Sequence, residues 1–184
     1  MRWFKAAGLG LIVLCAWTAT LFVATPVHQL VFRLTPTELA GRAQLDHSIT
    51  RYLLTANQSA LGVLTIEEQS HMADVRSVWL WLVSLSLVGF AWLGWSKPFV
   101  FWREALVVVA LLGLFTLLGF VPAFEAVHQV VFPGGNWQFP DQSLLLQTYP
   151  IAFFVWMWGT IVVASAVSLS VSQYLYRGKR HELR

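Results

Sequence analysis

Charged residues and cysteines are both scarce in this chain. Only 11% of its 184 residues are charged and 57% are hydrophobic, whereas soluble domains average about 25% charged residues. The single cysteine, Cys15, excludes an internal disulfide framework and a cysteine-rich metal site. The net charge of +3 is small and scattered, which argues against nucleic acid as a partner. The composition therefore indicates a protein of the cell membrane.

Four apolar runs are long enough to cross the hydrocarbon core of a bilayer, for which a helix needs roughly 20 residues. They lie near residues 6–25, 76–95, 105–127 and 150–174. We interpret the first run as a retained anchor and not as a signal peptide, because it lacks a clear cleavage site. The sequence predicts a multi-pass, all-α membrane protein with four transmembrane helices in a single membrane domain over 1–184.

The basic residues predict the orientation of these helices. Eight of the twelve Lys and Arg residues lie in three short segments that flank the apolar runs. These eight residues are Arg2 and Lys5, Lys97 and Arg103, and Arg177, Lys179, Arg180 and Arg184. Because basic flanks stay in the cytoplasm, both termini are expected to be cytoplasmic. Segment 26–64 is then expected to face outward.

The outward segment 26–64 carries signals for helices of its own. In "TPTE", Thr35 begins a capping box that has a proline at the first helical position. Further on, Ile49, Tyr52 and Leu53 have the spacing of one apolar helix face. We expect a small extracytoplasmic cap, with an irregular solvated loop as the alternative.

Ionisable residues gather just before the second apolar run. Thr65 and Glu68 form another capping box, which predicts a helix that starts there and continues into the membrane. Glu68, His71 and Asp74 recur every three residues and therefore share one side of that helix. The cluster is expected where the helix leaves the hydrocarbon and meets water.

A similar pair occupies the outer end of the third run, where Glu125 and His128 are again three residues apart. Since the second helix enters the membrane from outside and the third leaves toward it, His71 and His128 are expected at a similar depth. Acidic groups near a membrane are costly unless paired and tend to be functional. The alternative is that each histidine is an interfacial packing residue. His28, at the outer end of the first run, has no assigned role.

Two imidazoles without a protein nucleophile indicate acid–base chemistry, in which water or the substrate supplies the nucleophile. Cys15 lies inside the first apolar run and is not a suitable nucleophile. A zinc site is the competing interpretation, since Glu68, His71 and His128 form a possible ligand set. The chain lacks the His-Glu-x-x-His motif that would make zinc a strong prediction.

The loop after His128 reads "FPGGNWQF". Pro133, Gly134 and Gly135 predict a tight turn, whose backbone N–H groups can bind an anion. Trp137 suits the headgroup region of a membrane. A plain chain reversal is the alternative.

Taken together, "ITRYLL", "LTIEEQSHMADVR" and "FEAVHQVVFPGGNWQFPDQSLLLQTYPIAFF" on a four-helix frame resemble the bacterial lipoprotein intramolecular transacylase family. The resemblance covers residues 49 to 154. It departs mildly at Val131, where an aromatic residue is common. Enzymes of that family move an acyl chain from the diacylglyceryl group of a lipoprotein to the α-amino group of its N-terminal cysteine. The product is the lyso-form.

The resemblance implies that His71 and His128 are catalytic, without a cofactor or metal, and that the active site is extracytoplasmic. Its partners would be a diacylglyceryl-modified lipoprotein and membrane lipid, and no nucleic acid. Which histidine is the acid and which the base stays open. The candidates for orienting the rings or stabilising the oxyanion are Glu68, Asp74, Arg76, Glu125, Gly134 and Gly135, and those for contacting substrate or interface are Trp137 and Tyr52.

Two other functions fit the same residues. One is a metal-dependent hydrolase of membrane lipids or lipopeptides. The other is a non-enzymatic membrane subunit or lipid-binding protein.

Overall fold

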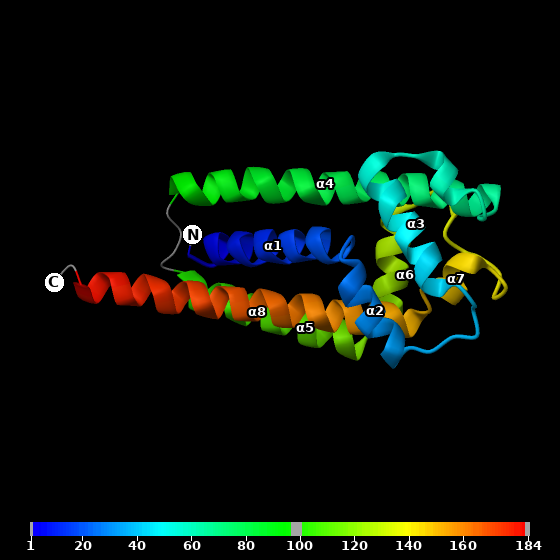
Figure 1. Ribbon diagram of the computed structural model, residues 1–184. Coiled ribbons are helices and arrows are strands. Elements are labelled where there is room, and N and C mark those ends of the chain that lie inside the picture. The colour runs from blue at the N-terminus through cyan, green and yellow to red at the C-terminus, as the bar shows by residue number, and fades with distance from the viewer. Residues whose placement is uncertain (1, 97–100, 183–184) are drawn as a thin grey trace. The chain divides into compact units, whose positions relative to one another are not determined.

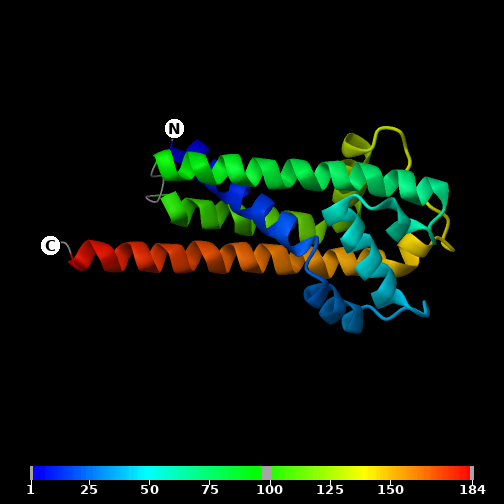
Figure 2. The same cartoon turned by 45° about the horizontal axis from the view of Figure 1, so that its top comes forward.

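The computed structural model describes residues 2–96 and 101–182, and no strand occurs among them. The elements, drawn in Figures 1 and 2, are α1 (Arg2–Leu21), α2 (Thr25–Leu34), α3 (Arg42–Thr55), η1 (Gln58–Leu61), α4 (Ile66–Ser96), α5 (Trp102–Leu118), α6 (Phe120–Val131), α7 (Leu144–Thr148) and α8 (Ile151–Glu182). η1 is a short 3-10 helix. The predicted all-α class is confirmed.

The chain divides into two compact units. The first unit contains Met1–Ala19, Leu82–Leu118 and Trp158–Arg184, and the second contains Thr20–Trp81 and Gly119–Met157. The two long helices α4 and α8 each contribute residues to both units. Every contact described below lies within one unit.

Three described helices are long and apolar enough to cross a membrane, namely Trp3–Leu21, Ile66–Leu93 and Ile151–Tyr174. A fourth span is possible if Trp102–Leu118 and Phe120–Val131 are counted together, although the chain bends by 100° at the break between them. The third apolar run is therefore not the single straight helix predicted over 105–127.

The break in the third run has a cause in its sequence. Gly119, at φ −125° and ψ 44°, departs from helical geometry, and glycine is among the weakest helix formers. Pro122 follows in the first turn of α6, where its missing N–H is tolerated. In one continuous helix the same ring would clash with the carbonyl of Leu118, four residues earlier.

Close helix packing organises the first unit. A Cβ added at Gly89 of α4 would lie 2.6 Å from Ile12 of α1, and one added at Gly113 of α5 would lie 2.6 Å from Val162 of α8. Small residues of this kind let membrane helices approach one another closely. The Trp17 indole also donates a 3.0 Å hydrogen bond to the Ser168 hydroxyl.

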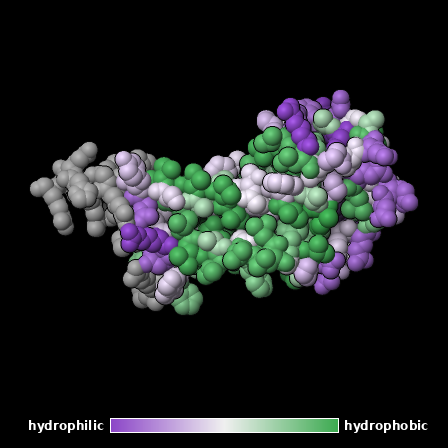
Figure 3. All heavy atoms as spheres, turned by 90° about the horizontal axis from the view of Figure 1, so that it is seen from below, coloured by the Kyte–Doolittle hydropathy of each residue, from purple (hydrophilic) through white to green (hydrophobic). Residues whose placement is uncertain are grey.

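The outer surface of the first unit is apolar. Large side chains such as Phe115 and Val163 are 77% and 62% exposed, and hydrophobic side chains predominate over this unit on the face drawn in Figure 3. Lipid tails would cover such a surface in a bilayer. This exposure suits helices that face hydrocarbon.

The second unit has its own core, built around α3. Segment 26–64 forms most of α2 together with α3 and η1, and is not an irregular loop. The apolar face predicted for this segment is buried, with Ile49 and Leu53 each 2% exposed. The buried members of this core are Leu45, Ile49, Tyr52, Leu53, Ala60, Leu61, Leu64, Met72 and Leu145.

The capping box predicted at Thr65 is present, whereas the one predicted at Thr35 is wrong. Thr65 N–H donates to the Glu68 carboxylate at 2.9 Å, and Glu68 N–H donates to the Thr65 hydroxyl at 3.2 Å. Thr35 instead ends α2, and its hydroxyl donates to the Val31 carbonyl at 3.0 Å. The Arg42 guanidinium donates to the Thr35 carbonyl, so Thr35 closes one helix and begins none.

Candidate functional site

The two histidines selected from the sequence lie together in the second unit. His71 is on α4 and His128 is on α6. Their ring centroids are 6.4 Å apart and their planes differ by 26°. His71 is buried, at 9% exposure, and His128 is half-buried. The fold thus brings the two imidazoles together, although His128 lies on α6, beyond the 100° bend, and not at the end of one straight third helix. Their predicted depth in the membrane stays a prediction.

The orientation of His128 is set by its own helix. Its Nδ1 lies 2.8 Å from the Phe124 carbonyl oxygen, one turn earlier on α6. Because a carbonyl oxygen can only accept, Nδ1 must carry the hydrogen. In the neutral ring Nε2 is then the nitrogen with a free lone pair. His128 is arranged to accept a proton at Nε2.

The Nδ1 atom of His71 is buried and has no hydrogen-bond partner within the described part of the chain. Most buried polar atoms in proteins are paired, and an exception calls for an explanation. A catalytic group that meets its partner only when substrate binds is one such explanation.

Aromatic rings surround both histidines. Phe132 and Phe139 lie 4.8 and 5.4 Å from the His71 ring. Phe124, Phe132 and Trp137 lie 3.9, 5.3 and 5.1 Å from the His128 ring. These rings exclude water from much of the space around the imidazoles. Trp137, predicted at an interface, is thus a wall of the histidine site.

A cavity of about 410 Å³ opens beside these rings. Its wall combines three aromatic side chains, one leucine, two glutamines and one carboxylate: Phe124, Trp137, Phe139, Leu146, Gln129, Gln138 and Glu125. The two histidines are not part of its lining, but three of the rings that enclose them are. Glu125 is exposed and faces this cavity.

Glu68 has a different role from the one expected of it. The carboxylate is 1% exposed, and its Oε1 accepts from the Ser143 hydroxyl at 2.6 Å and from Leu145 N–H at 3.1 Å. Its Oε2 closes the capping box with Thr65. Both oxygens are occupied in joining the start of α4 to the start of α7, so Glu68 holds the scaffold and does not orient an imidazole.

Asp74 and Arg76 also make structural contacts. The Asp74 carboxylate accepts a 2.6 Å hydrogen bond from the Asn136 side-chain amide, which fixes the loop after α6 to α4. The Arg76 Nε–H donates to the Leu53 carbonyl at 3.0 Å, near the end of α3. Each group positions a segment that adjoins the histidine site.

The glycine turn is present as predicted. Gly135 N–H donates to the Phe132 carbonyl at 3.1 Å, and Gly135 has a left-handed φ of +73°. This amide is occupied within the turn, which leaves Gly134 as the better candidate of the two for an oxyanion. Tyr52 is 5% exposed in the core of the second unit. It packs there and offers no ring to a substrate.

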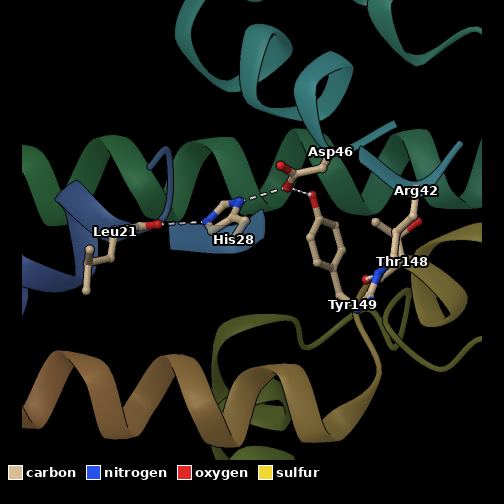
Figure 4. A network of polar contacts seen from close by, with 6 residues as sticks. All are labelled: Leu21, His28, Arg42, Asp46, Thr148 and Tyr149. Atoms are coloured by element: carbon tan, nitrogen blue, oxygen red, sulfur yellow. Dashed lines mark hydrogen bonds and ion pairs between the residues drawn. The ribbon is translucent and has the colours of Figure 1, made fainter. Parts of the chain in front are cut away.

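A second buried polar cluster was missed from the sequence (Figure 4). The Tyr149 hydroxyl donates to Asp46 Oδ1 at 2.7 Å, and His28 Nδ1 lies 2.7 Å from the same oxygen. His28 Nε2 donates to the Leu21 carbonyl at 2.8 Å. Beside it, Arg42 Nε–H donates to the Thr148 carbonyl at 2.8 Å. No local spacing links these residues, because the contacts join distant parts of the sequence.

Known proteins resemble this chain in sequence and in fold. Residues 10–154 match the family described as lipoprotein intramolecular transacylase Lit. A protein of Aquifex aeolicus (strain VF5), described as uncharacterized, is 33% identical over 113 residues. That similarity covers 54% of this chain and 49% of the relative, so the match spans about half of the relative's length.

Two solved structures share the fold. The in meso structure of the membrane-integral lipoprotein intramolecular transacylase Lit from Bacillus cereus has a TM-score of 0.75 at 12% identity, covering 100% of this chain and 97% of that one. A histidine-to-arginine variant from the same organism has a TM-score of 0.65 at 15% identity, with 97% and 91% covered. These identities support the fold alone. Because the family match over residues 10–154 spans most of the chain, this membrane protein belongs to the lipoprotein intramolecular transacylase family.

Proposed function

We propose that this protein moves one acyl chain from the diacylglyceryl group of a lipoprotein to the α-amino group of the lipoprotein's N-terminal cysteine. The observation that carries the proposal is the pair of imidazoles 6.4 Å apart within an aromatic enclosure. Family membership gives the acyltransferase class. We propose that the two imidazoles, of His71 and His128, are the groups that transfer the protons.

The reaction needs two proton transfers and no protein nucleophile. The amine nitrogen attacks the ester carbonyl carbon and loses a proton, and the carbon–oxygen bond to glycerol breaks as the glycerol oxygen gains a proton. An amide and a free glycerol hydroxyl result. We assign proton acceptance to His128, because its Nδ1–H is held by the Phe124 carbonyl and its Nε2 carries the lone pair. His71 then donates to the glycerol oxygen.

Ester, amine and leaving group belong to one bound molecule, so the protein acts mainly by orienting them. Well-oriented intramolecular reactions gain up to about 7–11 kcal/mol from proximity. The aromatic rings around the histidines would serve this end by confining the substrate. The Gly134 amide is our candidate for stabilising the oxyanion of the tetrahedral intermediate.

We also propose that both termini are cytoplasmic and that the histidine site faces the outer side. The basic flanks favour this orientation. The start of α1 and the end of α8 lie at the same end of the first unit in Figures 1 and 2, which agrees with termini on one side. Segment 26–64 would then be an extracytoplasmic cap.

The contacts give little support to the metal-dependent alternative. Within residues 2–96 and 101–182, no group of three His, Cys, Asp or Glu side chains is arranged to hold a metal ion. Glu68, one of the three ligands considered, is committed to Ser143, Leu145 and Thr65.

The reaction is tested by mass spectrometry of lipoproteins from cells that lack N-acylation of their own. Expression of this protein should convert the diacyl form to the lyso-form without change in total acyl content. Loss of a fatty acid to solvent would identify a hydrolase instead.

A further inference from the structure

The cavity next to the histidine site has the composition of a cation site. Its wall holds one carboxylate, from Glu125, two side-chain amides, from Gln129 and Gln138, and the rings of Phe124 and Trp137. Carboxylate and amide oxygens accept hydrogen bonds from an ammonium group. Aromatic faces attract the same charge. A cation that enters the cavity would find both kinds of partner on its wall.

Glu125 is the acidic residue among those that line the cavity. The Glu68 carboxylate is bonded to Ser143 and to backbone amides. The Asp74 carboxylate accepts from the Asn136 side chain. Glu125 is exposed on the cavity wall. A cationic ligand that enters the cavity would therefore be neutralised by Glu125.

The cavity is also adjacent to the proposed base. Phe124 and Trp137 line it, and their rings are 3.9 and 5.1 Å from the His128 ring. Glu125 and His128 lie three residues apart on α6. A cation held at Glu125 would thus lie near a histidine that accepts protons.

An acyl chain would fit this cavity poorly. Covering the carboxylate and two amides with hydrocarbon would remove them from water without replacing their hydrogen bonds, which is costly. The substrate of the proposed reaction carries an α-amino group of pKa about 7.7–8.0 and is therefore mostly an ammonium ion near neutral pH. The positive charge of the ammonium group suits the polar wall of the cavity, whereas the acyl chains of the same substrate do not.

We propose that Glu125 binds the α-ammonium group of the lipoprotein's N-terminal cysteine and presents it to His128. This proposal rests on the proposed function for the identity of the ligand. Glu125 is a binding and positioning residue. The ammonium group loses its first proton to solvent before attack, and the neutral amine then gives a second proton to His128 Nε2 as it attacks the ester carbonyl. A carboxylate beside the ammonium group raises the pKa of that amine. Replacing Glu125 by glutamine should therefore move the acid limb of the pH–rate profile to lower pH.

The binding test uses the full-length protein in detergent micelles and two probes that cannot react. Both are cysteinyl pentapeptides with a dialkylglyceryl ether on sulfur, which lacks an ester. One has a free α-amino group and the other has an α-hydroxyl in its place. The wild-type protein should bind the amine about fivefold more tightly at pH 7, as for a partly exposed ion pair. In Glu125→Gln the two probes should bind within twofold of each other.

Glu67→Gln is the matched control, because Glu67 is also an exposed glutamate of the second unit but does not line the cavity. It should retain the preference for the amine. A preference of equal size in Glu125→Gln, or none in the wild type, would overturn the inference.

Turnover of the ester-linked lipopeptide, followed by mass spectrometry, is measured separately. Failure to form the lyso-form while the Glu125-dependent preference persists would reject the proposed reaction and leave the cation site standing. Formation of the lyso-form without that preference would do the opposite.

Discussion

The carboxylate of Glu68 accepts a 2.6 Å hydrogen bond from the hydroxyl of Ser143, 75 residues further along the chain. This contact joins the start of α4, the helix that carries His71, to the start of α7. The start of α4 is therefore held by a buried carboxylate whose two oxygens both accept hydrogen bonds within the protein.

Replacing Glu68 by alanine should destabilise the second unit. The change removes hydrogen bonds to Ser143, Leu145 and Thr65, each worth roughly 1.5–3 kcal/mol. It also relieves the cost of burying a carboxylate, which offsets part of this loss. We expect a loss of about 2–4 kcal/mol in the free energy of unfolding, measured by thermal or denaturant unfolding in micelles. Glu67→Ala, at an exposed neighbouring position, should change stability by less than about 0.5 kcal/mol. Equal effects of the two changes would contradict this account.

Substitution of either histidine should abolish the reaction, with a different effect on stability at each position. His71→Ala and His128→Ala are each expected to abolish formation of the lyso-form, because one proton transfer is lost in each. The unfolding free energy of His128→Ala should fall by about 0.5–1.5 kcal/mol, the usual contribution of a hydrogen-bonding side chain. That of His71→Ala should fall by about 2–4 kcal/mol, because removing a buried ring packed against Phe132 and Phe139 leaves a cavity. Mass spectrometry of product and thermal unfolding of the same samples provide the two readings. Substantial turnover in either single variant would reject the paired mechanism.

The two loop glycines should respond differently to alanine. Gly135 has a φ of +73°, and a Cβ at Gly134 would meet no atom within 4 Å. Gly135→Ala should cost about 1–2 kcal/mol, because L residues are strained in the left-handed region. Gly134→Ala should be nearly neutral in stability and serves as the control. Unfolding measured for both variants side by side checks the prediction, and an equal loss would show that the turn does not require glycine at 135.

Alkaline pH should weaken the second unit through Tyr149. Burial and the adjacent Asp46 carboxylate raise the pKa of the Tyr149 hydroxyl well above its ordinary value. The unfolded chain ionises near pH 10, so this contribution to stability is full below that pH and is lost as pH rises further. Unfolding temperatures of the wild type should fall more steeply above about pH 10 than those of Tyr149→Phe. Parallel curves for the two proteins would exclude Tyr149 as the cause.

Reporter fusions test the proposed orientation. Reporters at the N- and C-termini should indicate the cytoplasm, and tags beside Asn57 or Gln138 should be accessible from outside, because the basic flanks are expected to stay inside. Asn57 and Gln138 are exposed, so labelling at these positions reads location and not burial. An external C-terminus would reverse the side assigned to both histidines.

Much of this fold could be predicted because its local signals are strong. Apolar length predicted the membrane helices, and the Thr65–Glu68 capping box predicted where α4 begins. The capping box predicted at Thr35 is wrong because Thr35 ends α2 and starts no helix. The Arg42 guanidinium donates to the Thr35 carbonyl at this helix end, a contact that the local sequence does not reveal. The bend near Gly119 was missed because apolar length does not distinguish a straight helix from two shorter ones.

The histidine pair could be proposed from topology, because two successive membrane crossings in opposite directions would end at one level. The bend that places His128 on a separate short helix could not be foreseen in this way. Contacts between segments that are distant in the sequence could not be predicted in this way. The Glu68–Ser143 bond and the His28–Asp46–Tyr149 cluster depend on how α2, α3, α4 and α7 pack. Glu68 illustrates why. Its position in the sequence suited two roles, one beside His71 on the same helix face and one in a capping box with Thr65. In the structure its carboxylate takes part in the capping box.

Because the helix breaks at Gly119, the proposed base lies on a short helix, α6, that is separate from α5. Phe124, which fixes the His128 ring, Glu125, which faces the cavity, and His128 itself occupy one short helix. Their mutual geometry is set by helical pitch and survives any tilt of that helix. What a tilt alters is the spacing between His128 and His71. A change in the angle of α6 would therefore alter the distance between the two imidazoles and leave the tautomer of His128 unchanged.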